Sequence, residues 1–536
     1  MTAGKETAMH DLILRDARII DGKCTDSFYG DIAVSDGIIQ EIAPKINAPA
    51  ARELFLNGNI AAPGFIDIHT HSELVPFLQQ TRPRSKLFQG VTTEIVGNCG
   101  ISSFPLSDTF YQQICDFYYA TVPNSAEPIP LVDYNTQQYA AHIIRSAPYI
   151  NYGALIGHGT LRGSVMGFGM EAPTKEQLHE MEAVLDRELS MGAFGMSLGL
   201  IYPPSSFSHQ EELVALAKVL RQHDAILAVH MRNEGPCVFQ AVDEMLKIAR
   251  LSGVRLQISH LKLMGKQQWG RSSELLEIIE RERQNGVQVT CDQYPYPASS
   301  TGLSALVPGW ALDGGVHALI ERLKPPSQQL LDDIGAEMER RGGADCVMIV
   351  STHGVHRDVE GKTLAQLAVE QQTTAPQQAA RLLLACNGAV NCIYFSMAQN
   401  DVNIIMRDLN IAVASDGCSY DYDEQTRSNR LHPRSFGTFP RFFQTVREQK
   451  LLTPEQAVYK ASGLPAKILG LPDRGMLEVG KVADITVFNW NEIADCCTYL
   501  DPVVKPAGIV HVLVKGVPVL ENGIETGKHP GTVLLH

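Results

Sequence analysis

Short apolar segments that alternate with helical segments fill the middle of this 536-residue chain. The apolar segments end in polar residues and lie at 92–96, 151–156, 193–198, 225–229, 255–259, 288–291, 346–350 and 411–414. Helical periodicity separates several of them, at 176–191, 210–223 and 273–285. Repeated strand–helix units of this kind predict an α/β fold, specifically a (β/α)8 (TIM) barrel.

The two ends of the chain carry a different pattern, in which short strand-like segments are separated by turns. Asp36-Gly37 and Asn57-Gly58 are typical of β-hairpin connections. We therefore predict a small β-sandwich domain built from 1–62 and 468–536, and a catalytic barrel over 63–467. A Pro- and Gly-punctuated stretch near 297–345 is predicted to be an insertion over the barrel mouth, serving as a lid.

Composition limits the class of protein. A hydrophobic content of 44% and a charged content of 19% are typical of a soluble globular protein. The net charge of −14 and the absence of a basic patch disfavour nucleic-acid binding. No apolar stretch reaches the ~18–20 residues of a membrane span, the first residues lack a signal-peptide pattern, and the eleven cysteines show no disulfide-framework spacing. We expect a cytoplasmic protein without a membrane partner; the oligomeric state, a homo-oligomer included, stays open.

Six residues capable of binding a metal stand where apolar segments end. Residues 63–71 finish with His69 and His71, whose side chains share one face because strand residues i and i+2 do so. The other four are Cys99, His230, His260 and Asp416. Active sites of barrels lie at the carboxyl ends of the strands, and imidazole, thiolate and carboxylate together suit Zn²⁺. Asp416 is the candidate for moving protons beside the metal.

Several longer motifs make a resemblance specific. They are Gln-Gly-Val-Thr-Thr-Glu-Ile-Val-Gly-Asn-Cys-Gly at 89–100, Gly-His-Gly-Thr-Leu-Arg at 157–162, Ser-His-Leu-Lys at 259–262, Tyr-Pro-Tyr at 294–296 and His-Pro-Arg-Ser-Phe-Gly-Thr-Phe-Pro-Arg at 432–441. In these motifs the chain resembles the amidohydrolase superfamily and, within it, the N-acyl-D-amino-acid deacylase (D-aminoacylase) family. The resemblance runs across nearly the whole chain.

The resemblance implies zinc-dependent hydrolysis of an N-acyl-D-amino acid to a D-amino acid and a carboxylate. It implies that Cys99, His230 and His260 hold one zinc tightly, and that His69, His71 and Asp416 border a second, weaker metal position. It also implies a grip on the substrate α-carboxylate, by Lys262, Arg434 and one tyrosine of the pair Tyr294 and Tyr296. Tyr202 is a candidate for helping to polarise the scissile carbonyl.

Two other functions stay open at this point. One is a related amidohydrolase that acts on a cyclic amide or an N-acyl dipeptide. The other is a non-catalytic assembly protein on the same fold, which the retention of all six metal-capable residues disfavours. The sequence leaves undecided the preferred side chain, the acyl group and the number of working metals.

Overall fold

Eight parallel strand positions form a closed barrel in the computed structural model, which describes residues 9–77, 84–121, 130–427 and 430–536. A three-stranded parallel sheet pairs β6 (Phe65–Asp67), β7 (Val91–Val96) and β8 (Asn151–Ala154). A six-stranded one continues through β9 (Ile156–Gly157), β10 (Gly195–Gly199), β11 (Ile226–His230), β12 (Arg255–Ile258), β13 (Val289–Gln293) and β17 (Ile411–Val413). Strands β8 and β9 flank Leu155 and together occupy one position, and a parallel bridge between Thr70 and Gly417 joins the last strand to the first. The predicted (β/α)8 barrel is confirmed.

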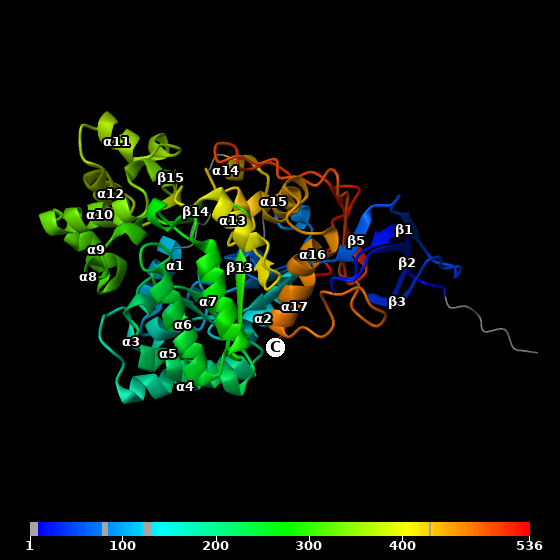
Figure 1. The fold of residues 1–536 in the computed structure, drawn as a ribbon. Helices are drawn as coiled ribbons and strands as arrows, with labels where there is room; N and C mark the ends of the chain where they lie inside the picture. Colours follow the sequence, from blue (N-terminus) through cyan, green and yellow to red (C-terminus); the bar gives the residue numbers. More distant parts are fainter. Residues whose placement is uncertain (1–8, 78–83, 122–129, 428–429) are drawn as a thin grey trace, which may run out of the picture.

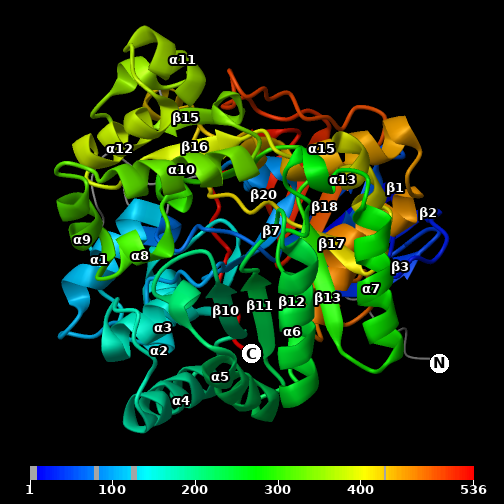
Figure 2. The same cartoon turned by 60° about the vertical axis from the view of Figure 1, so that its left-hand side comes forward.

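Amphipathic helices cover the outside of the barrel, as Figure 2 shows beside β10–β13. The principal ones are α4 (Lys175–Ser190), α5 (Gln210–Gln222), α6 (Val238–Ser252), α7 (Ser272–Gln284) and α13 (Gln399–Met406). Thr174 caps the start of helix α4: its side chain and that of Gln177 form a capping box that satisfies amide groups of the first turn. Smaller helices α2 (Thr136–Ser146) and α3 (His158–Met166) lie on either side of β8 and β9 in the chain. In the described part of the chain, no helix combines the length and apolarity needed to cross a bilayer.

The two ends of the chain share one nine-stranded sheet. Its members are β1 (Leu12–Ile19), β2 (Phe28–Ser35), β3 (Ile38–Ala43), β4 (Glu53–Phe55), β5 (Ile60–Pro63), β18 (Ile485–Phe488), β19 (Ile509–Val514), β20 (Val517–Glu521) and β21 (Ile524–Glu525). Asp36 and Gly37 both have positive φ, so the predicted hairpin between β2 and β3 is confirmed. Asn57-Gly58 does not make a hairpin, because β4 and β5 both pair in parallel with β1. The first eight residues of the predicted 1–62 segment lie outside the described residues.

An inserted unit interrupts the barrel between β13 and α13. Strands β14 (Ser299–Gly302), β15 (Val347–Ser351) and β16 (Asn391–Tyr394) form an antiparallel sheet in the order β14-β16-β15. Its helices are α8 (Gly309–Leu312), α9 (Gly315–Arg322), α10 (Gln328–Arg340), α11 (Leu364–Glu370) and α12 (Ala375–Ala385). The apolar segment 346–350, expected to be a barrel strand, belongs to this sheet instead, because a short apolar run does not specify its pairing partner. The unit contains the predicted insertion 297–345 and continues through β16, on the side of the barrel away from β1–β3 (Figure 1).

A cluster of aromatic rings joins the barrel to the terminal sheet. Phe443 of α15 (Arg434–Gln449) has its ring centroid 5.0 Å from Phe65 of β6 and 5.0 Å from Phe488 of β18. All three side chains are fully buried. Phe443→Ala is expected to lower the free energy of unfolding by about 3–5 kcal/mol, because it leaves a cavity that rigid neighbours fill poorly. Denaturant unfolding measures this change; a cost under about 1 kcal/mol would contradict the packing role.

Candidate metal centre

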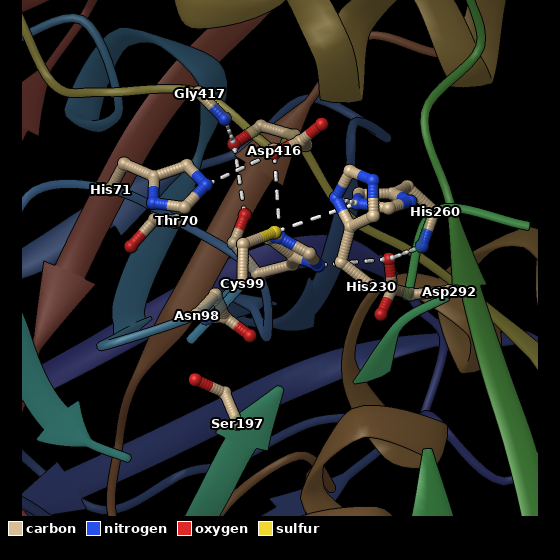
Figure 3. Close-up of polar contacts among 12 residues, drawn as sticks. Thr70, His71, Asn98, Cys99, Ser197, His230, His260, Asp292, Asp416 and Gly417 are labelled. Carbon is tan, nitrogen blue, oxygen red and sulfur yellow. Dashed lines mark hydrogen bonds and ion pairs between the residues drawn. The ribbon is translucent and has the colours of Figure 1, made fainter. Parts of the chain in front are cut away.

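The structure brings all six metal-capable residues together at the carboxyl end of the barrel. His69 and His71 follow β6, Cys99 follows β7, His230 ends β11, and His260 and Asp416 follow β12 and β17. Each position is the first turn after a strand or the last residue of one, where side chains from different strands converge. Figure 3 shows His71, Cys99, His230, His260 and Asp416 converging from separate elements.

The donor atoms of this cluster lie close enough to share a cation. Cys99 Sγ is 3.3 Å from His69 Nε2 and 3.5 Å from His260 Nε2. His230 Nδ1 is 2.9 Å from His260 Nε2, and Asp416 Oδ1 is 3.2 Å from His71 Nε2. One donor atom from each of His69, Cys99, His260 and Asp416 lies within 4.8 Å of the others. A buried sulfur, a carboxylate and imidazole nitrogens at this spacing fit zinc in both ligand type and number.

Three of the donors sit on strained backbone. Cys99, His260 and Asp416 have φ of 52°, 36° and 51°, a region that residues other than glycine seldom adopt. Hydrogen bonds hold two of these turns: the His260 amide donates to Asp292 Oδ1 (2.7 Å), and the Asp416 amide donates to the His69 carbonyl (2.9 Å). Strain of this kind persists where surrounding contacts fix it, typically at functional sites.

The charges in the cluster reinforce one another. Burial raises the pKa of the Cys99 thiol, but His69 and His260 outweigh it and hold that pKa well below its usual range. Burial likewise raises the pKa of the Asp416 carboxyl, and Arg434 and His260 hold it well below the usual range. Cys99 is therefore a thiolate and Asp416 a carboxylate at neutral pH, which are the ionisation states that bind a metal.

The residues expected to grip a carboxylate lie beside the cluster, in a cavity that Lys262, Tyr294 and Arg434 line. Lys262 Nζ is 2.5 Å from Glu234 Oε1 and 2.7 Å from His260 Nδ1. Arg434 donates from Nη1 to Asp416 Oδ2 at 2.6 Å. The Tyr294 ring lies near both cations, with its centroid 5.6 Å from Lys262 Nζ and 5.2 Å from the Arg434 guanidinium carbon.

The two tyrosines of the Tyr-Pro-Tyr motif face different surroundings. The Tyr294 hydroxyl is buried and has no hydrogen-bond partner among the described residues. Tyr296 is not among the cavity-lining side chains; its hydroxyl donates to Asp495 Oδ2 at 2.8 Å. Tyr202 lines the cavity, with its ring 5.4 Å from that of His230 and its hydroxyl 2.6 Å from Thr301 Oγ1.

Known proteins match this chain over nearly its whole length. It is 34% identical over 531 residues to N-acyl-D-glutamate deacylase of Alcaligenes xylosoxydans xylosoxydans, covering 98% of this chain and 96% of the relative. It is 33% identical to D-aminoacylase of the same organism, covering 98% and 97%. The amidohydrolase family model matches residues 408–520. The chain belongs to the D-aminoacylase family of amidohydrolases.

A solved structure of this family superposes on the chain. It is the N-acyl-D-glutamate deacylase of Bordetella bronchiseptica, complexed with zinc and a phosphonate inhibitor that mimics the tetrahedral intermediate of the reaction. The TM-score is 0.83 at 32% identity, and the match covers 99% of this chain and 100% of that one. As a member of the D-aminoacylase family, the chain is a metal-dependent amidohydrolase.

Residues 195–199 read Gly-Met-Ser-Leu-Gly, a match to the Gly-x-Ser-x-Gly pattern of serine hydrolases that our sequence reasoning overlooked. Ser197 is not placed as a nucleophile. It lies inside strand β10, fully buried, accepts from the Gly100 amide at 2.9 Å and donates to the Gly97 carbonyl at 2.5 Å. In this member of the D-aminoacylase family, Ser197 therefore stabilises the turn that presents Cys99, by hydrogen bonds to Gly97 and Gly100 on either side of that residue. Figure 3 shows Ser197 on the strand below Asn98 and Cys99.

Two further carboxylates of the site were absent from the sequence-based set. Asp292 Oδ1 lies 3.3 Å from His69 Nδ1, the ring nitrogen that does not face Cys99, where a carboxylate orients the imidazole. Glu234 Oε1 lies 2.9 Å from His260 Nδ1 and also pairs with Lys262. Their signals were present in the sequence: Asp292 closes an apolar segment, and Glu234 follows His230 by four residues.

Proposed function

We propose that this enzyme hydrolyses the amide bond of N-acyl-D-amino acids and releases a D-amino acid and a carboxylate. The observation that carries the proposal is the buried Tyr294 hydroxyl, which has no hydrogen-bond partner among the described residues and belongs to a ring that lies near both Lys262 and Arg434. A phenol and two cations form a receptor for a carboxylate. The distance from this receptor to the cluster is short, since Lys262 contacts His260 and Arg434 contacts Asp416.

Cys99, His230 and His260 are the residues we propose to hold one zinc tightly, with His69, His71 and Asp416 around a second, weaker position. When bound, zinc supplies a Lewis acid that polarises a carbonyl and lowers the pKa of water. The protein's own contribution to proton movement is Asp416: its depressed pKa keeps it ionised, so that the carboxylate is available to accept a proton from water and then to donate it to the leaving amine.

The other residues orient the substrate. Lys262, Arg434 and Tyr294 bind the α-carboxylate, and Tyr202, which lines the cavity with its ring 5.4 Å from that of His230, is the candidate for contact with the acyl carbonyl. Eleven cysteines without disulfides support the expectation of a reducing, cytoplasmic compartment. A cyclic imide lacks a free α-carboxylate and could not form charge-assisted hydrogen bonds with Lys262 and Arg434, which disfavours the cyclic-amide alternative.

Three fixed contacts, at the carbonyl, the α-carboxylate and the side chain, define one hand at Cα. We expect N-acetyl-D-amino acids to be hydrolysed with kcat/KM at least about 10²-fold above their L-isomers and above their α-carboxamides, because an L-isomer cannot make all three contacts at once and a carboxamide loses the charge-assisted hydrogen bonds of the carboxylate. The measurement is kcat/KM for N-acetyl-D-methionine, -glutamate and -aspartate, their L-isomers and their amides, alongside cyclic imides. Equal rates for L-isomers or amides would refute the proposed grip.

Arg434→Ala is expected to erase most of the discrimination between acid and amide. Arg434 also contacts Asp416, so the variant slows both substrates, and the acid-to-amide ratio removes that shared loss. Arg441→Gln is the matched control, an arginine on the same helix that lies over Tyr296 rather than in the cavity. An unchanged ratio in Arg434→Ala would exclude Arg434 from carboxylate binding.

A further inference from the structure

Arg341 brings a third cation to the cavity, from the inserted unit rather than the barrel. It follows helix α10, and its side chain lines the cavity with a side-chain exposure of 14%. Nε is 2.9 Å from Glu337 Oε1, and Nη2 donates to the Ala305 carbonyl at 3.3 Å. Nη1 makes no hydrogen bond or ion pair within the described residues.

The charge of Arg341 is balanced differently from that of the other cavity cations. Lys262 and Arg434 pair with Glu234 and Asp416, carboxylates that line the same cavity. Glu337, the partner of Arg341, is not among the cavity-lining residues and is shared with a second arginine. Arg340 Nη1 lies 3.0 Å from Glu337 Oε2, and the Arg340 side chain is 58% exposed. Arg341 therefore has its direct ion-pair partner outside the cavity, whereas Glu234, the cavity carboxylate that interacts with it at longer range, is already paired with Lys262.

Arg341 and Arg434 stand along one wall, which is formed by β14. Arg434 Nη2 donates to the carbonyl of Ser300 at 3.1 Å. Two residues further along this strand, the Gly302 carbonyl accepts from the Tyr394 hydroxyl at 3.1 Å, and the Arg341 guanidinium lies 5.3 Å from the centroid of the Tyr394 ring. Residues i and i+2 of a strand lie about 6–7 Å apart. The wall thus presents two separated guanidinium groups to one substrate.

Polar groups line the cavity between these arginines. Thr301 and Asn391, on the paired strands β14 and β16, both face it. Asn391 Nδ2 lies 3.2 Å from His353 Nε2, and Asn391 Oδ1 is a buried acceptor without a hydrogen-bond partner among the described residues. An apolar substrate side chain at this end would desolvate the Arg341 guanidinium without compensation. A side chain ending in a carboxylate would accept a charge-assisted hydrogen bond from Arg341 Nη1, the nitrogen that Glu337 and Ala305 leave free.

We propose that Arg341 binds the side-chain carboxylate of the substrate, so that the preferred substrates are N-acyl-D-amino acids with an acidic side chain, of the glutamate and aspartate type. The inference rests on the proposed deacylase function and on the assignment of the α-carboxylate to Lys262, Arg434 and Tyr294. In this proposal Arg341 determines which substrate side chain is preferred, whereas bond cleavage depends on the metal-binding residues and Asp416.

The first test uses the unaltered, zinc-loaded enzyme and pairs of substrates that differ only in side-chain charge. N-acetyl-D-glutamate is compared with N-acetyl-D-glutamine, and N-acetyl-D-aspartate with N-acetyl-D-asparagine. The expected kcat/KM is roughly 10- to 10²-fold higher for the acid in at least one pair, because this ratio corresponds to the free energy of one hydrogen bond to a charged group. Equal values in both pairs, with the amides well hydrolysed, overturn this inference and leave the deacylase function intact. Hydrolysis of no N-acetyl-D-amino acid overturns both.

The second test assigns the preference to Arg341. In R341Q, kcat/KM for the acidic substrate is expected to fall roughly 10- to 10²-fold, mainly through KM, while N-acetyl-D-glutamine changes by less than about threefold. R341K, which keeps the charge but not the fork, is expected to recover part of the loss. R340Q is the matched control, since it removes the exposed arginine that shares Glu337, and is expected to behave as wild type. Equal losses for acid and amide in R341Q, or the same selectivity change in R340Q, contradict the assignment.

Discussion

Replacing Cys99 by alanine is expected to remove the tightly held zinc and the hydrolytic activity together. Cys99 supplies the only thiolate among the donors of the cluster in the described part of the chain, and its Sγ lies 3.3 and 3.5 Å from the imidazoles of His69 and His260. Loss of one ligand from a zinc site removes a large part of its binding free energy. Elemental analysis of the purified variant measures the zinc, and N-acetyl-D-amino-acid hydrolysis measures the activity.

Cys291→Ala is the matched control for this variant. Cys291 is a fully buried thiol of barrel strand β13, but burial raises its pKa to about 12, so it stays neutral and acts as a small apolar side chain. The control is expected to lose some stability while keeping zinc and activity. A Cys99→Ala protein that retains one zinc per chain would show that the metal is held by other residues.

The sequence predicted the barrel and the convergence of the six metal-capable residues because both depend on local patterns. A polar residue at the end of an apolar segment indicates where a strand reaches the carboxyl end of the barrel. Parallel strands bring these ends together, however far apart the residues are in the chain. His69 and Asp416 are 347 positions apart, yet the Asp416 amide bonds the His69 carbonyl at 2.9 Å. The Asp36-Gly37 hairpin was predictable for the same reason, since a two-residue turn needs no distant partner.

What sequence reasoning missed depends on long-range pairing. The apolar segment at 346–350 has the composition of a barrel strand, but β14 and β16 recruit it into the antiparallel sheet of the inserted unit. The Tyr-Pro-Tyr motif does not distinguish Tyr294 from Tyr296. In the structure the Tyr296 hydroxyl donates to Asp495 Oδ2 at 2.8 Å, and Tyr294 is the tyrosine of the pair that lines the cavity. No sequence motif marks Arg341, because its position in the cavity wall arises from the packing of the inserted unit against the barrel.

The arrangement of charge divides the cavity into two functional regions. Around the metal cluster, each cation is paired with a carboxylate, so Lys262 and Arg434 are held in place before substrate binds. Pre-organised groups of this kind spend little free energy on reorganisation. At the far end of the β14 wall, Arg341 is paired on its outer side with Glu337. The first region is suited to a group common to every substrate, and the second to a group that distinguishes one substrate from another.

Asp416→Asn is expected to keep the fold and the tight zinc but to lower kcat roughly 10²–10⁴-fold, the usual effect of removing a general acid–base group. Asparagine preserves the shape of the side chain, and its amide cannot accept the proton that the carboxylate takes. Asp408→Asn is the matched control: Asp408 precedes strand β17, at the opposite end of the barrel, and pairs with Arg283 at 3.4 Å. Zinc content, circular dichroism and kcat are measured on both variants. If zinc-loaded Asp416→Asn turned over substrate at a near-normal kcat, proton transfer would have to be assigned to another group, and Glu234, which contacts His260 Nδ1 at 2.9 Å, would be the next carboxylate to replace.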